Sequence, residues 1–169
     1  MTPAAPAGPG GPLAPGDAVP GGVPVRDQYG APLRLGELWE DGPALLVLVP
    51  GAFSTHCTAE LGALVAATAQ FEDAGAQLAV LSCDPVPVLR AWGQEHGARF
   101  PLLSDFWPHG RACRALGAFD DELGVARRTS LLLVDGRVRW ALHGEHGRAR
   151  AVGEHMDTVR DVLAGGAPG

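Results

Sequence analysis

Two uninterrupted apolar runs, each followed by a helical pattern, organise the first half of the chain. Residues 45–49 show no polar alternation, which predicts a strand buried on both faces near the centre of a sheet. Apolar residues then recur at helical spacing over residues 61–71, and Gly75 lies where such a helix would end. A second buried strand is predicted over residues 78–82, before a helix through residues 89–92. The pattern indicates one complete β-α-β unit.

The second half of the chain ends in a predicted hairpin and a predicted helix. Asp135-Gly136 separates two apolar-rich runs, residues 131–134 and 138–142, which is typical of a two-residue turn between antiparallel strands. Residues 155–163 repeat apolar positions every three and four, so we expect an amphipathic helix that Gly165-Gly166 ends. The element order β-α-β-α-β-β-α predicts an α/β protein of the thioredoxin-like fold, with a central mixed sheet flanked by helices and an N-terminal extension.

The two ends of the chain differ in composition from its middle. The 169 residues include 24 Gly and 15 Pro, which are concentrated at the termini. We therefore expect disordered tails over residues 1–15 and 165–169, around one domain over residues 16–164. Near the start of that domain, residues 23–28 predict an edge strand, because proline is tolerated at the edges of sheets.

Charge and hydropathy narrow the classes of partner. The formal net charge is −6 and no block of six like charges occurs, so we expect no nucleic acid as a partner. The N-terminus has no signal-peptide pattern, and no apolar run approaches the ~20 residues that span a bilayer. We expect no membrane partner and a cytoplasmic location, which three widely spaced cysteines, suited to a reducing compartment, also favour.

The candidate chemistry lies where the first buried strand meets its helix. Cys57 follows Pro50 and a loop of small residues, near the first turn of the predicted helix. Backbone N–H groups and the positive end of the helix dipole favour a thiolate there, and the thiolate is the nucleophilic form of cysteine. A packed and unreactive thiol is the alternative, but this position favours a reactive one.

The spacing Pro50-x-x-x-Ser54-x-x-Cys57, with Glu60 three positions further on, resembles the active-site loop of peroxiredoxins, in which the hydroxyl residue is usually threonine. Residues 100–110 resemble the corresponding segment of alkyl hydroperoxide reductase E, a one-cysteine branch of that family. The resemblance covers roughly residues 16–163. It implies that Cys57 attacks a peroxide, that Ser54 and loop N–H groups hold the peroxide, and that Pro50 shields the thiolate.

The resemblance also implies an arginine that stabilises the leaving oxygen. In peroxiredoxins this arginine opens the strand before the hairpin in an Arg-x-Ser/Thr pattern, which Arg128-Thr129-Ser130 matches. Side chains alternate along a strand, so only one of the neighbours Arg127 and Arg128 can face the site, and we favour Arg128. Glu60 would hold this arginine through a bidentate contact, or would simply be an acid that the helix dipole favours.

Other residues with reactive side chains are expected to stay outside this set. Cys83 and Cys113 are each expected to be packed thiols, with Cys113 the better candidate for a resolving cysteine. His56 is expected to point away from the sulfur of Cys57. No pair of ligands has zinc spacing, so neither a metal nor another cofactor is expected. The aromatic segment 106–108 suits either the wall of the site or a contact between subunits.

These observations predict an enzyme, a thiol peroxidase of the oxidoreductase class. Its substrate would be hydrogen peroxide, an organic hydroperoxide or peroxynitrite, and Cys57 would become a sulfenic acid. An external thiol or a thioredoxin-like or glutaredoxin-like protein would restore the thiol. We expect a homodimer or a higher homo-oligomer. Two alternatives stay open: a peroxide sensor or redox relay that oxidises a partner protein, and an inert thioredoxin-fold binding module.

Overall fold

The computed structural model describes residues 11–145 and 147–165. In chain order the elements are β1 (Pro24–Arg26), β2 (Pro32–Arg34), the 3-10 helix η1 (Leu35–Trp39), β3 (Ala44–Leu48), α1 (Thr55–Asp73), β4 (Gln77–Ser82), α2 (Val86–His96), β5 (Leu102–Ser104), α3 (Arg111–Ala115), β6 (Phe119–Asp120), β7 (Val125–Ala126), β8 (Thr129–Val134), β9 (Arg137–His143) and α4 (Val152–Leu163). The predicted fold class is confirmed, with β3-α1-β4-α2 and β8-β9-α4 forming the thioredoxin-like core.

Seven strands form one mixed sheet in the order β2-β1-β5-β4-β3-β8-β9. The strands β3, β4 and β5 are parallel to one another, while β8 runs antiparallel to β3. All five residues of β3 are buried, as predicted for an interior strand. The predicted edge strand is wrong in one respect: β1 pairs with both β2 and β5, and β2 is the edge. Pro24 is tolerated because it is the first residue of β1.

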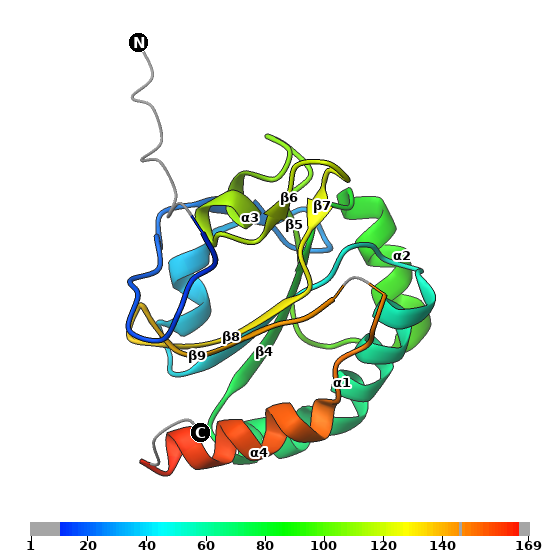
Figure 1. Cartoon of the computed structure of the whole chain (residues 1–169). Coiled ribbons are helices and arrows are strands. Elements are labelled where there is room, and N and C mark those ends of the chain that lie inside the picture. The colour runs from blue at the N-terminus through cyan, green and yellow to red at the C-terminus, as the bar shows by residue number, and fades with distance from the viewer. Residues whose placement is uncertain (1–10, 146, 166–169) are drawn as a thin grey trace.

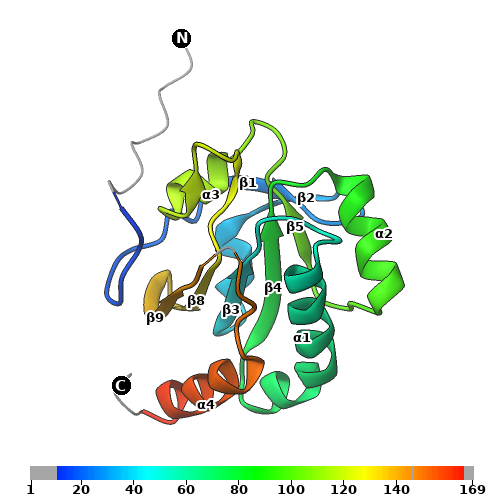
Figure 2. The same ribbon diagram turned by 45° about the vertical axis from the view of Figure 1, so that its right-hand side comes forward.

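Helices cover one face of the sheet, and shorter elements cover the other (Figure 1, Figure 2). Leu45 and Val47 of β3 pack in the cluster that includes residues of α1, α2 and α4. Leu46 and Leu48 pack on the opposite face, in the cluster that includes residues of η1, α3 and the N-terminal segment. Because successive side chains of a strand alternate between faces, β3 divides the core into two layers.

The folded part of the chain begins earlier than predicted. Leu13, which falls within the expected tail over residues 1–15, is 2% exposed and packs in the core. Its burial and the hydrogen bond from the backbone N–H of Gly16 to the carbonyl of Val138 attach this segment to the sheet. The rest of the two expected tails, residues 1–10 and 166–169, lies outside the described residues.

The β8-β9 hairpin places the start of β8 beside the end of β3. Asp135 and Gly136 have φ values of 50° and 77°, as a two-residue turn with both central residues in the left-handed region requires, so the predicted hairpin is confirmed. In the ladder between β8 and β3, Thr129 lies opposite Leu48. Arg128, immediately before β8, is therefore close to the loop that leads from β3 to α1.

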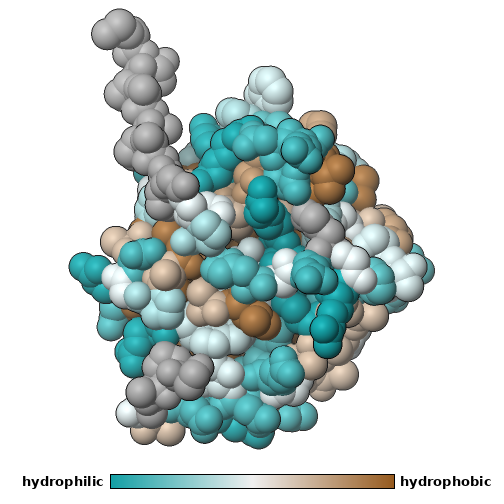
Figure 3. All heavy atoms as spheres, in the orientation of Figure 1, coloured by the Kyte–Doolittle hydropathy of each residue, from teal (hydrophilic) through white to brown (hydrophobic). Residues whose placement is uncertain are grey.

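The face seen in Figure 3 is mostly hydrophilic or intermediate, with the strongly hydrophobic residues in small separate groups. Within the described part of the chain, no helix combines the length and the apolar character that crossing a membrane requires.

Candidate active site

Cys57 lies in the first turn of α1, with its side chain buried. Ser54 is the N-cap of this helix, and its hydroxyl oxygen accepts a hydrogen bond from the backbone N–H of Cys57 at 3.3 Å. Ser54 has extended backbone angles, as N-cap residues do, and a serine oxygen satisfies one of the free N–H groups at the helix start. Cys57 itself is 0% exposed. The sequence therefore places the thiol at the positive end of the helix dipole, as predicted.

The loop between β3 and α1 is held by a residue from the neighbouring strand. Asp84, two positions beyond β4, accepts a hydrogen bond from the backbone N–H of Ala52 at 2.8 Å and another from the hydroxyl of Ser82 at 2.8 Å. Pro50, partly exposed, opens this loop. Asp84 was not among the residues predicted for the site. The available signal was its position just after a buried strand, because the carboxyl ends of adjacent parallel strands meet at one edge of a sheet.

Arg128 is the arginine that faces the thiol. Its Nη2 atom donates a hydrogen bond to the sulfur of Cys57 at 3.6 Å, and its Nε atom donates to the carbonyl of Glu145 at 3.0 Å. Arg128 is 2% exposed, whereas Arg127 is exposed and donates to the carbonyl of Phe119. Of the two neighbours, Arg128 is therefore the one beside the sulfur, and its role in the reaction stays a prediction.

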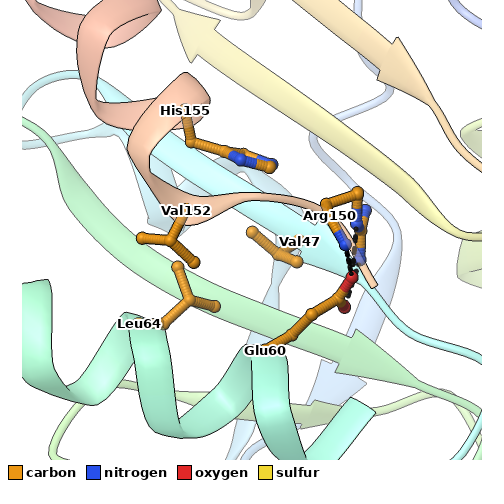
Figure 4. Close-up of a pocket in the computed structure, with 6 residues that line it drawn as sticks. All are labelled: Val47, Glu60, Leu64, Arg150, Val152 and His155. Atoms are coloured by element: carbon orange, nitrogen blue, oxygen red, sulfur yellow. Dashed lines mark hydrogen bonds and ion pairs between the residues drawn. The ribbon is translucent and has the colours of Figure 1, made fainter. Parts of the chain in front are cut away.

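Glu60 binds two arginines from different parts of the chain. Its Oε2 atom pairs with Nη1 of Arg128 at 2.8 Å. Its bidentate contact, however, is with Arg150, from Nε to Oε1 at 3.1 Å and from Nη2 to Oε2 at 2.9 Å (Figure 4). The expected bidentate contact thus forms with Arg150, while Arg128 makes a single ion pair with Glu60. Arg150 had no motif to identify it, because only the fold brings residues 60 and 150 together.

A chain of hydrogen bonds links Arg150 through Ser130 to His155. The Nδ1 atom of His155 lies 2.8 Å from the carbonyl of Ala151, which can only accept, so Nδ1 carries a proton. Burial lowers the pKa of His155 and so favours the neutral ring, in which Nε2 is an acceptor. Nε2 lies 2.7 Å from the hydroxyl of Ser130, which therefore donates to it. The same hydroxyl oxygen accepts from Nη1 of Arg150 at 2.8 Å. His155 is thus a neutral end point of the network that holds Arg150.

Burial and the oppositely charged partner have opposing effects on the pKa of Glu60 and on the pKa of Arg150. Burial alone would raise the pKa of Glu60, but the hydrogen bonds and charge of Arg150, together with the charge of Arg128, outweigh burial and lower it. Burial lowers the pKa of Arg150, and Glu60 opposes this effect. Two guanidinium groups therefore share one carboxylate, and one of them, that of Arg128, also contacts the sulfur of Cys57.

The other predicted residues lie apart from this site. His56 is exposed, in contrast to its buried neighbour Cys57. Cys83 and Cys113 are buried in the core cluster on the other face of the sheet from the cluster that holds Cys57. Trp107 is 83% exposed, which places it on the surface.

Comparison with known proteins identifies the family of this chain. The model of the AhpC/TSA family matches residues 15–141. The chain belongs to the AhpC/TSA family. Alkyl hydroperoxide reductase E of Mycobacterium bovis is 36% identical to it over 107 residues, which are 63% of this chain and 70% of the relative. A putative peroxiredoxin of Mycobacterium tuberculosis is 28% identical over 145 residues, which are 83% of this chain and 93% of the relative.

Solved structures of AhpC/TSA-type proteins have the same fold. The crystal structure of peroxidoxin BcpB from Mycobacterium tuberculosis superimposes with a TM-score of 0.79 and 27% identity, covering 90% of this chain and 97% of that one. Peroxiredoxin 6 of Arenicola marina gives a TM-score of 0.80 at 18% identity, over 89% of this chain and 73% of that one, which shows the fold alone. The predicted assignment to the peroxiredoxins, and with it to the thiol peroxidases, is confirmed.

Proposed function

We propose that this peroxiredoxin reduces hydroperoxides by nucleophilic attack of Cys57. The observation that carries the proposal is the 3.6 Å contact between Nη2 of Arg128 and the buried sulfur. The thiolate attacks one peroxide oxygen, the O–O bond breaks, and the other oxygen leaves as hydroxide or alkoxide and takes up a proton. Cys57 becomes a sulfenic acid. The charge of Arg128 stabilises both the thiolate and the developing negative charge of the leaving oxygen.

The neighbouring residues position the reactants. Because the oxygen of Ser54 accepts the N–H of Cys57, its own hydroxyl hydrogen is available to a peroxide oxygen. Glu60 fixes the orientation of Arg128 through their ion pair. Pro50 has no N–H that would compete for the peroxide, and its ring shields one side of the loop.

The substrates we propose are hydrogen peroxide, organic hydroperoxides and peroxynitrite, and the reductant is an external thiol or a thioredoxin-like or glutaredoxin-like protein. The burial of Cys83 and Cys113 on the other face of the sheet supports an external reductant, because a disulfide requires Cα atoms within about 7 Å. A 1-Cys peroxiredoxin of Zea mays is 30% identical over 130 residues, which are 68% of this chain and 55% of the relative. Its name supports the same proposal.

We also propose a homodimer or a higher homo-oligomer in the cytoplasm. Phe53, Phe106 and Trp107 are 49%, 49% and 83% exposed, in loops that follow the parallel strands β3 and β5. Parallel strands end at the same edge of a sheet, so these aromatic side chains suit a contact between subunits near the site. The three free cysteines fit a reducing compartment.

Stopped-flow oxidation followed by tryptophan fluorescence tests the peroxidase assignment. Cys57→Ser should abolish the reaction and keep the fold, because a hydroxyl has nearly the same volume but is far less ionised. In the wild-type protein, one equivalent of peroxide should consume one thiol and add one oxygen atom to the intact mass. Turnover by Cys57→Ser would refute the assignment. Stoichiometric oxidation that no thiol reductant reverses would favour a sensor or relay.

A further inference from the structure

Cys83 and Cys113 contact each other in the core, away from the Cys57 site. Their sulfur atoms are 3.9 Å apart, although 30 positions separate the two residues in the chain. Cys83 directly follows β4 and is 5% exposed, and Cys113 lies in α3 and is 0% exposed. The pair is therefore created by the fold, and the reaction proposed for Cys57 uses neither thiol.

A buried carboxylate lies beside this pair. Asp105 is 4% exposed, and its two oxygens accept the backbone N–H groups of Ala112 at 2.9 Å and Cys113 at 2.8 Å. The sulfur of Cys113 lies within 4.8 Å of a carboxylate oxygen of Asp105. The hydrogen bond to Cys83, burial and the charge of Asp105 raise the pKa of Cys113, while burial raises the pKa of Asp105 against the hydrogen bonds it accepts. Asp105 is therefore both adjacent to a thiol proton and more basic than an ordinary aspartate.

The segment that carries Cys113 is short and bounded by glycines. The helix α3 has five residues, with Gly110 at its start and Gly117 just beyond its end, and these glycines have φ values of 76° and 66°. A disulfide needs the two sulfur atoms at about 2.05 Å, so the contact must close by about 2 Å. The helix α3 lies outside the sheet, so a shift of this short segment would break no strand pairing.

We propose that Cys83 and Cys113 form a second redox site, which a hydroperoxide converts into an intramolecular disulfide. Cys83, the more exposed of the two residues, attacks one peroxide oxygen; the O–O bond breaks, an alcohol or water leaves, and Cys83 becomes a sulfenic acid. Cys113 then attacks the sulfur of Cys83. The S–S bond forms as the S–O bond breaks, and the proton of the Cys113 thiol passes through Asp105 to the departing hydroxide, which leaves as water. Two thiols lose two electrons and two protons in total, and the peroxide gains them.

The alternative interpretation of this cluster is a metal-binding site. In the described residues, Cys83, Asp105 and Cys113 are a group whose possible ligand atoms lie within 4.8 Å of one another. Structural zinc sites take four ligands, however, and this group offers three. The number of donors therefore favours the disulfide.

The test uses the full-length Cys57→Ser variant, in which Cys83 and Cys113 are the two cysteines left of three. Excess hydrogen peroxide under native conditions should remove both thiols together and lower the intact mass by two hydrogen atoms. Dithiothreitol should restore both, and a non-reduced digest should contain one peptide that links the two positions. Because this variant lacks Cys57, the result is independent of the proposed peroxidase function, and either can fail without the other.

Two variants in the same background are the matched controls. Cys57→Ser combined with Cys113→Ser should gain one oxygen at Cys83, whereas Cys57→Ser combined with Cys83→Ser lacks the attacking sulfur and should gain none. Neither should lose two hydrogen atoms, and circular dichroism should show that each variant is folded. Oxygen addition without a disulfide in the folded Cys57→Ser variant would overturn the proposal. So would a disulfide that forms only in urea. One equivalent of zinc in the purified protein, with both thiols protected until a chelator is added, would identify a metal site in its place.

Discussion

Arg150 binds Glu60 through two parallel hydrogen bonds, from Nε to Oε1 at 3.1 Å and from Nη2 to Oε2 at 2.9 Å. The same carboxylate pairs with Arg128 at 2.8 Å, and Arg128 in turn donates to the sulfur of Cys57. A bidentate contact fixes the planes of both groups, so Arg150 orients the carboxylate and the carboxylate orients Arg128. The position of the positive charge at the sulfur thus depends on a residue 90 positions away from Glu60.

Glu60→Gln should weaken both the fold and the reaction. The glutamine removes the negative charge that pairs with two buried guanidinium groups, and breaking a buried ion pair costs about 3–5 kcal/mol of unfolding free energy. Because Arg128 would move away from its partner, we expect the rate of Cys57 oxidation to fall by up to about 100-fold. Urea unfolding and stopped-flow oxidation by hydrogen peroxide measure the two effects.

Glu72→Gln is the matched control for this prediction. Glu72 lies in the same helix, α1, and is exposed. Removing its charge should change the unfolding free energy by no more than about 0.5 kcal/mol and leave the rate unchanged. Equal effects at positions 60 and 72 would contradict the role given to Glu60.

Arg128→Ala should slow the reaction of Cys57 with peroxide by about 10- to 1000-fold, the range for losing one charged group that stabilises a developing anion. Arg127→Ala, which removes an exposed neighbour bonded to the carbonyl of Phe119, should be nearly neutral. Second-order rate constants from stopped-flow fluorescence separate the two variants. If Arg127→Ala proved the damaging change, the assignment of the leaving-group arginine would be wrong.

Local sequence patterns predicted the elements that carry the site. The apolar run of β3, the turn at Asp135-Gly136 and the position of Cys57 at a helix start each follow from spacing over a few residues. The same patterns could not find Arg150, because its partner Glu60 lies 90 positions earlier in α1 and no feature of residues 147–151 requires a buried arginine. They also treated Leu13 as part of a tail, since one leucine among Pro, Gly and Ala gives no periodic signal.

Contacts between separate elements also could not be predicted from the sequence. The predicted edge strand β1 is covered because β2 folds back on it, an arrangement that the composition of β1 does not reveal. Cys83 and Cys113 were each predicted to be packed thiols, and only the fold shows that they contact each other. Pairings over 30 or 90 positions depend on the topology of the whole sheet, which single segments do not encode.

Ser54→Ala should destabilise the start of α1. The variant removes the oxygen that accepts the backbone N–H of Cys57, and loss of an N-cap costs about 0.5–2 kcal/mol. It also removes the hydroxyl proposed to hold the peroxide, so the oxidation rate should fall together with the melting temperature. Ser54→Thr keeps the oxygen and should retain both properties. A normal rate in Ser54→Ala would exclude the hydroxyl as a peroxide ligand.

His155 should make the stability of the protein depend on pH below about 6.5, the ordinary pKa of histidine. Burial lowers its pKa in the folded state; the charge of Arg150 adds to this, and the hydrogen bond to Ala151 and the charges of Glu60 and Glu154 oppose it. The unfolded chain then binds the proton more readily than the folded one, so the unfolding free energy decreases as the pH falls through this window. Urea unfolding between pH 7 and pH 5 measures the slope.

His155→Gln tests whether this one side chain causes the slope. The glutamine oxygen can accept the hydroxyl of Ser130 as Nε2 does, but the amide cannot take up a proton, so the stability should become flatter with pH. Glu60 contributes to a separate window: its pKa is lowered, so its stabilising effect is present above its ordinary value of 4.5 and is lost at lower pH. Above pH 5, therefore, the difference between the two proteins reports on His155. An unchanged slope in His155→Gln would assign the pH dependence to other groups.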